Sequence, residues 1–142
     1  MTKFLYDLVI KPFYLLNDSG NMSKILVCGS RDYDDYEKLR VTLKYYLAKY
    51  KTPTIIEGGA PGADTLARSY AENNYVPFIE VKADWSKYGR AAGPLRNTKM
   101  LKMKPNLVIA FSSKDELTPG TRDTVTKAKK LGIKVRVIYS DE

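Results

Sequence analysis

The chain has 142 residues, with 24 Lys and Arg against 16 Asp and Glu, which gives a formal net charge of +8. It contains no histidine and a single cysteine, Cys28. These counts exclude an intramolecular disulfide, a multi-cysteine zinc site and any mechanism that uses an imidazole. The length fits one domain, and the low cysteine content fits a reducing cytoplasm.

The basic residues are concentrated in the second half of the chain. Residues 82–142 contain 14 Lys and Arg against 6 Asp and Glu, whereas residues 1–81 contain 10 of each kind. Such an excess attracts phosphate-bearing partners. A solvated helix face explains part of it equally well, because Lys127, Lys129 and Lys130 fall where a helix would expose them.

The first residues differ from the rest of the chain. Residues 4–16 are apolar but are interrupted by two charged residues and a proline, so they neither span a bilayer nor form a secretory signal. They are either an accessory segment that packs on the domain or on a partner, or sequence upstream of a start at Met22. We expect an accessory segment 1–22, a domain 23–142, a cytoplasmic location and no membrane association.

From Lys24 onward, short apolar β-branched runs alternate with helical periods. Because the runs are continuous rather than alternating, they predict a parallel sheet that is covered on both faces. The predicted fold is an α/β, Rossmann-like three-layer sandwich with a mostly parallel five-stranded sheet. The expected strands are residues 25–27, 54–56, 78–81, 107–111 and 135–138, and the expected helices are residues 36–50, 63–71, 94–103 and 121–131.

Ligands of such sheets bind beyond the carboxyl ends of the strands, where this chain places its glycine-rich turns. In the second turn, Gly58, Gly59 and Gly62 allow backbone amides to approach an anion, and the following helix directs its positive end to the same place. The spacing matches neither a Walker loop nor a dinucleotide fingerprint. The turn therefore either binds phosphate or is simply a tight turn.

Three further segments carry candidate binding groups. Gly29, Ser30 and Arg31 follow the first strand, and the arginine either grips an anion or pairs with nearby aspartates. The turn at 118–123 offers backbone amides at a helix start, and it is also typical of an ordinary helix cap. In segment 83–97 an aromatic pair lies beside two arginines, so it either stacks a base or covers the sheet edge.

Four motifs in this order resemble the YspA-like branch of the SLOG superfamily. They are C-G-S-R-D-Y at 28–33, G-G-A-P-G-A-D-T-L-A at 58–67, A-D-W-x-x-Y-G-x-A-A-G-P-x-R-N at 83–97 and P-G-T-x-D at 119–123. The resemblance spans Lys24 to Ile138. It implies a Rossmann-like domain that binds nucleotides or nucleotide-derived ligands, and no metal or cofactor. Because many relatives are dimers, it also implies a homodimer.

The superfamily includes the cytokinin-activating phosphoribohydrolases, the DNA-processing protein DprA and nucleotide-sensing domains of bacterial defence systems. In the hydrolases a P-G-G-x-G-T loop binds phosphate, while an arginine and a glutamate support cleavage of the N-glycosidic bond. By resemblance, Gly120 and Thr121 match the end of that loop, Arg96 the arginine and Asp123 the acid. This chain has one glycine pair fewer and Asp in place of Glu.

Three functions follow from these residues and from the resemblance. The first is binding or sensing of a nucleotide without turnover. The second is an N-glycosidase that releases the base from a nucleoside 5′-monophosphate, and the third is DprA-like binding of nucleic acid. The candidate catalytic residues are Asp123, Arg96 and Asp64, the candidate phosphate-binding residues are Gly29, Ser30, Arg31, Gly58, Gly59, Gly62, Gly120 and Thr121, and the candidate base-stacking residues are Trp85 and Tyr88.

Overall fold

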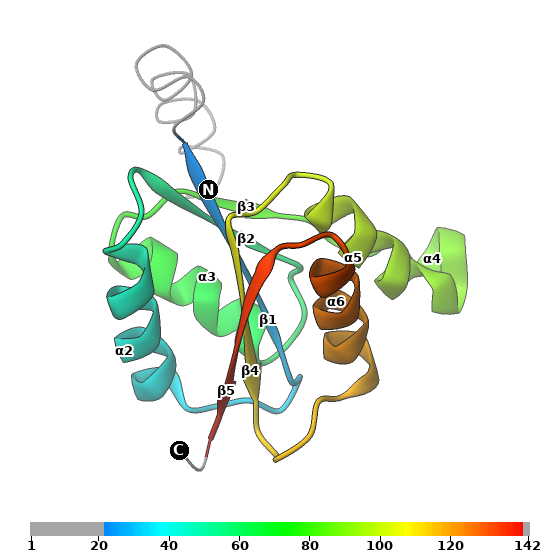
Figure 1. Cartoon of the computed structure of the whole chain (residues 1–142). Helices are drawn as coiled ribbons and strands as arrows, with labels where there is room; N and C mark the ends of the chain where they lie inside the picture. Colours follow the sequence, from blue (N-terminus) through cyan, green and yellow to red (C-terminus); the bar gives the residue numbers. More distant parts are fainter. Residues whose placement is uncertain (1–21, 141–142) are drawn as a thin grey trace.

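The computed structural model describes residues 22–140, in which one parallel sheet is covered by helices (Figure 1). The predicted accessory segment 1–22 lies, apart from Met22, outside the described residues. All four strand pairings are parallel, in the order β3-β2-β1-β4-β5. The strands are β1 (Ser23–Gly29), β2 (Pro53–Glu57), β3 (Phe78–Glu80), β4 (Leu107–Ser112) and β5 (Lys134–Tyr139).

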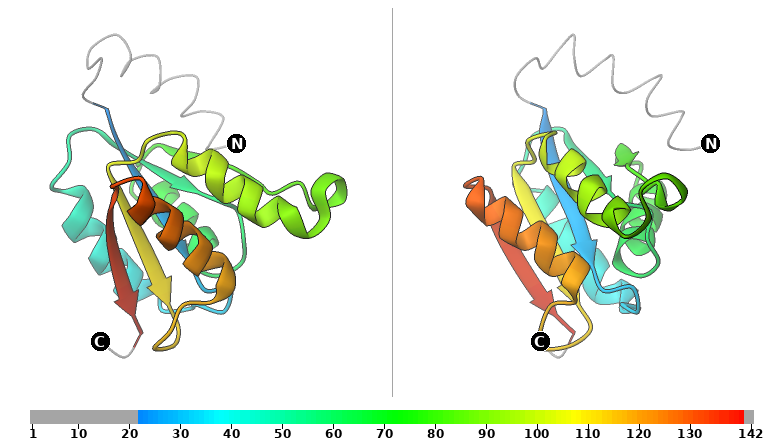
Figure 2. Two further views of the ribbon diagram at one scale, coloured as in Figure 1. Left: turned by 45° about the vertical axis from the view of Figure 1, so that its right-hand side comes forward. Right: turned by 90° about the vertical axis from the view of Figure 1, so that its right-hand side faces the viewer.

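Helices cover both faces of the sheet, which confirms the predicted three-layer α/β architecture (Figure 2). None of the helices in the described range is long and apolar enough to cross a membrane. One face carries α2 (Tyr36–Leu47) and α3 (Ala63–Asn73), and the other carries α5 (Ala92–Leu101) and α6 (Pro119–Lys130), while α4 (Trp85–Tyr88) and the 3₁₀ turn η1 (Gly89–Ala91) project beyond α5.

The hydrophobic core has two parts because successive strand residues point to opposite faces. Ile25, Ile55 and Leu107 are register partners in neighbouring strands and pack with α2 and α3. Leu26 and Val108 are likewise register partners and pack with α5 and α6 on the other face. The middle residues of β1, β2 and β4 are therefore apolar on both faces, as predicted.

Several element ends differ from the expectation by a few residues, and two of the differences between sequence pattern and structure have a clear physical reason. Helix α6 begins at Pro119, two residues before the predicted start. Proline suits the first helical position because its φ is helical and the N–H that it lacks would have no partner within the helix. Strand β5 alternates exposed Lys134 and Arg136 with half-buried valines. As an edge strand, β5 buries one face against α6 and leaves the other less covered.

The turn into α3 requires glycine at position 62. Gly62 has φ +84°, and a Cβ there would collide with the backbone of Ser30 and Arg31. Gly120, by contrast, has no atom within 4 Å of the position of a Cβ.

We expect Gly62→Ala to lower the free energy of unfolding by about 1–3 kcal/mol, whereas Gly120→Ala leaves it nearly unchanged. Urea unfolding of the two variants tests this, and equal stabilities would contradict it.

Candidate functional site

A cleft of about 720 Å³ opens beyond the carboxyl ends of β1 and β4. The chain leaves β1 towards β2 on one side, and β4 lies on the other, so the cleft stands where the strand order reverses. Open α/β sheets bind their ligands at this switch point. The predicted site residues that line the cleft are Gly29, Arg31, Asp64, Trp85, Arg96, Gly120, Thr121 and Asp123.

The other predicted site residues, Ser30, Gly58, Gly59, Gly62 and Tyr88, are not part of the cleft lining. Ser30 is 1% exposed, and its Oγ accepts a hydrogen bond of 3.1 Å from the backbone amide of Ser113. The hydroxyl of Ser30 therefore joins the loops after β1 and β4. Tyr88 lies on α4 and is half exposed, with the Lys87 ammonium 5.1 Å from its ring centroid.

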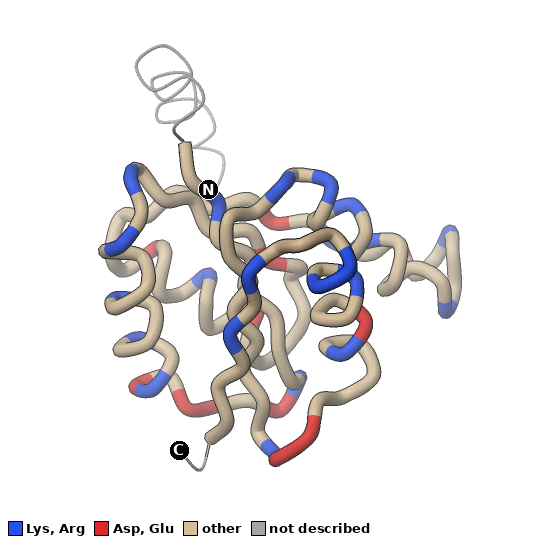
Figure 3. The backbone as a smooth tube through the Cα atoms, viewed as in Figure 1, with Lys and Arg blue, Asp and Glu red and all other residues tan. Residues whose placement is uncertain are grey.

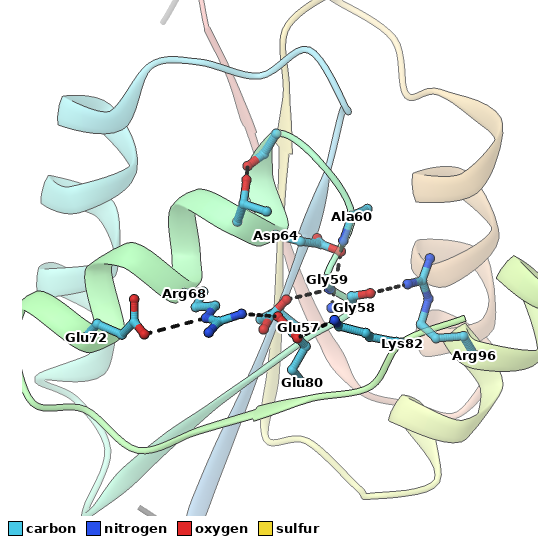
Figure 4. A network of polar contacts seen from close by, with 12 residues as sticks. Glu57, Gly58, Gly59, Ala60, Asp64, Arg68, Glu72, Glu80, Lys82 and Arg96 are labelled. Atoms are coloured by element: carbon cyan, nitrogen blue, oxygen red, sulfur yellow. Dashed lines mark hydrogen bonds and ion pairs between the residues drawn. The ribbon is translucent and has the colours of Figure 1, made fainter. Parts of the chain in front are cut away.

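The glycine loop after β2 uses its amides within the protein (Figure 4). The amides of Gly58 and Ala60 donate to Asp64 Oδ2 at 3.1 and 3.2 Å. The amide of Gly59 donates to Glu57 Oε1 at 2.6 Å. This loop thus surrounds protein carboxylates in the way that it was predicted to surround phosphate.

Asp64 lies in the first turn of α3 and is only 6% exposed. Burial raises the pKa of its carboxyl to about 6, against the opposing effects of the two loop amides and of Arg96 and Arg31. The negative charge of Asp64 is therefore stabilised by the amides of the loop after β2 and by the two arginines of the cleft. A carboxyl with this pKa exchanges its proton close to neutral pH.

Arg96 on α5 is held in place by two hydrogen bonds. Its Nη1 donates to the carbonyl oxygen of Gly58 at 2.6 Å, and its Nε donates to Asn97 Oδ1 at 2.9 Å. A Cβ at position 58 would collide with the guanidinium, so glycine at this position is needed for the contact. Arg96 thereby ties the loop after β2 to the helix on the other side of the cleft.

Asn97 is a site residue that the sequence analysis missed. It is 5% exposed, lines the cleft, and its amide nitrogen donates to Asp123 Oδ2 at 3.1 Å. Lys127 also donates to Asp123 Oδ2, at 3.0 Å, and to Thr98 Oγ1 at 3.0 Å. These bonds fix Asp123 between α5 and α6. The sequence did contain a signal for Asn97. It lies three positions before Met100 and four before Leu101, so a polar side chain falls on the buried face of the helix.

The remaining walls of the cleft are aromatic and apolar. Trp85 is half exposed, and the Arg31 guanidinium carbon lies 5.7 Å from its ring centroid. Cys28 and Met100 line the cleft and are almost completely buried. Burial raises the pKa of the Cys28 thiol far above its ordinary value. Trp85 thus belongs to the cleft lining, where its ring faces Arg31.

A buried pair of carboxyl groups supports the glycine loop from below (Figure 4). Glu57 and Glu80 are register partners at the ends of β2 and β3, and their side chains are 0% and 6% exposed. Burial and the hydrogen bond with Glu80 raise the pKa of Glu57 well above its usual range, so the pair retains a proton. Arg68 and Lys82 lie 3.3 and 3.8 Å from the Glu80 carboxylate. Among residues 22–140, no three acidic, Cys or His side chains cluster as metal ligands would.

The fold, the strand order and the cleft at the switch point define a Rossmann-like α/β domain. The model of the "YspA, cpYpsA-related SLOG family" matches residues 23–88. The Gene 61 protein of Mycobacterium phage D29 is 33% identical in an alignment 125 residues long, and the match covers 80% of this chain and 94% of that protein. The chain belongs to the YspA, cpYpsA-related SLOG family, as its motifs predicted.

Among solved structures, the chain is similar to DNA processing protein A (DprA) from Streptococcus pneumoniae, with a TM-score of 0.50. The sequence identity is 18%, so the likeness concerns the fold alone. The match covers 80% of this chain and 58% of the DprA chain, so the chain corresponds to little more than half of that protein.

The proton held by the Glu57 and Glu80 carboxyl groups makes the free energy of unfolding depend on pH. A carboxyl group whose pKa is raised by folding binds its proton more tightly in the folded than in the unfolded chain, so the free energy of unfolding falls as the pH rises above the ordinary range of a glutamate. We expect Glu57→Gln, which mimics the protonated acid, to flatten this decline between about pH 5 and pH 9.

Urea unfolding at several pH values measures the decline, with the exposed Glu116→Gln as control. The control variant should retain the pH dependence of the unmodified protein. A pH profile of Glu57→Gln that is as steep as that of the control would show that the pair holds no proton.

Proposed function

We propose that the cleft binds a nucleotide or a nucleotide-derived ligand, with its phosphate at the N-terminus of α6. The first amides of a helix have no partner within the helix, and the helix dipole favours an anion beside them. Gly120 and Thr121 supply these amides in the cleft lining. Arg31 and Arg96, which line the same cleft, supply positive charge for the phosphate.

The remaining lining suits the rest of a nucleotide. Trp85 offers an exposed aromatic face for a base, and Cys28 and Met100 offer apolar contacts. Asp64 is a carboxyl group that can accept hydrogen bonds from sugar hydroxyls. A volume of about 720 Å³ lies within the range of small-molecule sites.

The observation that carries the proposal is the meeting of opposite charges in one cleft at the switch point. Arg31 and Arg96 line it together with Asp32, Asp64 and Asp123. A mixed lining of this kind suits a ligand that has one anionic end and several hydroxyl groups. It does not favour a continuous polyanion, because the three carboxylates would repel successive phosphates.

The phosphate position is tested by Gly120→Val. The absence of neighbouring atoms around a Cβ at this position predicts a folded variant, while the added branches obstruct the helix amides. We expect affinity for the ligand to fall at least about tenfold, since hydrogen bonds to a charged group contribute roughly 1.5–3 kcal/mol each. Calorimetric titration with nucleoside 5′-monophosphates, NAD and ADP-ribose provides the measurement.

Gly120→Ala is the control for this experiment, because its smaller side chain adds bulk without branches. A folded Gly120→Val variant that binds as tightly as the unmodified protein would place the phosphate elsewhere. If no compound of the panel binds to the unmodified protein, the proposed function fails for these ligands.

A second candidate function is N-glycosidase activity on the same ligand class. Two carboxyl groups of the cleft lining, those of Asp64 and Asp123, favour it. Asp123 is held by Asn97 and Lys127, and Asp64 has a pKa of about 6. Cleavage of an N-glycosidic bond develops positive charge on the ribose, which a carboxylate stabilises while water adds to C1′, and a second carboxyl group gives a proton to the departing base. Asp123 would act near the ribose, and Arg96 would orient the phosphate.

Turnover is tested by incubating the protein with the same panel and detecting free base by liquid chromatography and mass spectrometry. If the protein is a glycosidase, base appears with the unmodified protein, and Asp123→Asn slows its release at least about 100-fold. Thermal unfolding of Asp123→Asn serves as the control for folding. Intact ligands that nonetheless bind would leave binding or sensing as the function.

A further inference from the structure

A second cavity lies at the opposite end of the sheet from the cleft, between the end of α2 and the start of β5. Its volume is about 310 Å³, and Leu107, at the beginning of β4, forms part of its lining. We call this cavity the basic groove. Its other lining residues are aromatic or positively charged, namely Tyr45, Tyr46, Tyr50, Lys49, Lys134 and Arg136.

The groove lies beside the beginning of the edge strand, where Lys134 and Arg136 are exposed, whereas Ile138 near its end packs on the core under α2. Val135 and Val137 pack towards α6, so the alternation of the strand turns Lys134 and Arg136 to the side of α2. Both basic side chains are exposed. Helix α2 buries Leu47 in the core and contributes its tyrosines to the groove from the other side.

Charge separates the groove from the cleft. Within residues 22–140, the groove lining contains three cationic side chains and no carboxylate, whereas the cleft lining contains three carboxylates and two arginines. Figure 3 shows basic residues along β5 and acidic residues in the loops after β1 and β4, at the other end of the sheet. The groove therefore attracts anions, and unlike the cleft it places no negative charge in their way.

Flat aromatic faces lie among these cations. Tyr45 is 59% exposed and meets Tyr46 edge-to-face, with ring centroids 5.0 Å apart. The Lys49 ammonium lies 4.5 Å from the centroid of the Tyr45 ring. An exposed tyrosine with a cation beside it can stack a base while the cation neutralises the adjoining phosphate.

We propose that the basic groove binds single-stranded nucleic acid. Basic side chains that follow a backbone and aromatic side chains that stack on bases are the two elements of such recognition. Lys134 and Arg136 are two residues apart on one face of a strand, so their Cα atoms are separated by about 6.6 Å. At this separation the two side chains can each neutralise a phosphate of one strand. Base faces are accessible for stacking on Tyr45 in a single strand and are covered in a duplex.

The test measures the anisotropy of fluorescein-labelled dT15 titrated with the full chain at several salt concentrations. We expect binding at low salt that weakens steeply as salt is added. In Lys134→Glu/Arg136→Glu the affinity should fall at least about tenfold, and the slope against the logarithm of salt concentration should decrease by about 1.4, because each phosphate contact contributes about 0.7. Tyr45→Ala should lose at least about fivefold, the effect of one stacked base.

Two matched variants control for charge and for loss of a tyrosine. Lys129→Glu/Lys130→Glu makes the same change in net charge at exposed positions on α6, outside the groove. Tyr75→Ala removes a tyrosine that is 83% exposed and lies outside the groove. Both should bind dT15 within about twofold of the unmodified protein.

Several outcomes would overturn the proposal. They are no binding of dT15 at low salt, equal losses in the two charge-reversal variants, or unchanged affinity in Tyr45→Ala. Equal affinity for polyglutamate would assign the groove to acidic peptides. A change of oligomeric state in Lys134→Glu/Arg136→Glu with unchanged dT15 binding would show that these charges only protect the sheet edge.

The groove and the cleft are tested separately. Gly120→Val should bind dT15 normally, and the groove variants should bind the nucleotide panel like the unmodified protein. If Gly120→Val loses dT15 binding and the groove variants keep it, the nucleic acid binds in the cleft, and the proposal for the groove is wrong. The titration with the nucleotide panel would still test the proposed function of the cleft.

Discussion

The arrangement of the cleft depends on the capture of backbone amides by two buried carboxyl groups. Asp64 and Glu57 accept the amides of residues 58–60, so the loop after β2 folds back on the protein. This fold turns the carbonyl oxygen of Gly58 towards α5, where it accepts from Arg96. The constraint therefore places a guanidinium and a carboxyl group in the same cleft and links the two faces of the sheet.

The same contacts explain how far the sequence could predict the site. The glycine turn correctly marked the carboxyl ends of the strands, because a tight turn into a helix needs residues without a Cβ. It did not reveal where the amides point. A loop that surrounds a ligand phosphate and a loop that surrounds its own Asp64 have the same glycines, and only the positions of Asp64 and Glu57 in space distinguish them.

The fold was more predictable than the site because its determinants are local. Apolar runs and helical periods define the strands and helices, and continuous runs define a sheet buried on both faces. Contacts between helices are not local. Asn97 and Asp123 are 26 positions apart, and their hydrogen bond depends on how α5 packs against α6. Likewise, the net charge did not reveal that the described lining of the basic groove has three cations and no carboxylate, whereas the cleft lining combines two arginines with three carboxylates.

The buried thiol of Cys28 has a consequence for chemical reactivity. It is the only cysteine in the chain, it lines the cleft, and its pKa is raised by burial, so the nucleophilic thiolate is scarce in the folded protein. A thiol reagent consequently reacts mainly with molecules in which the cleft has opened to solvent. The protein thus contains a single natural reporter whose alkylation rate measures how often the floor of its cleft is exposed.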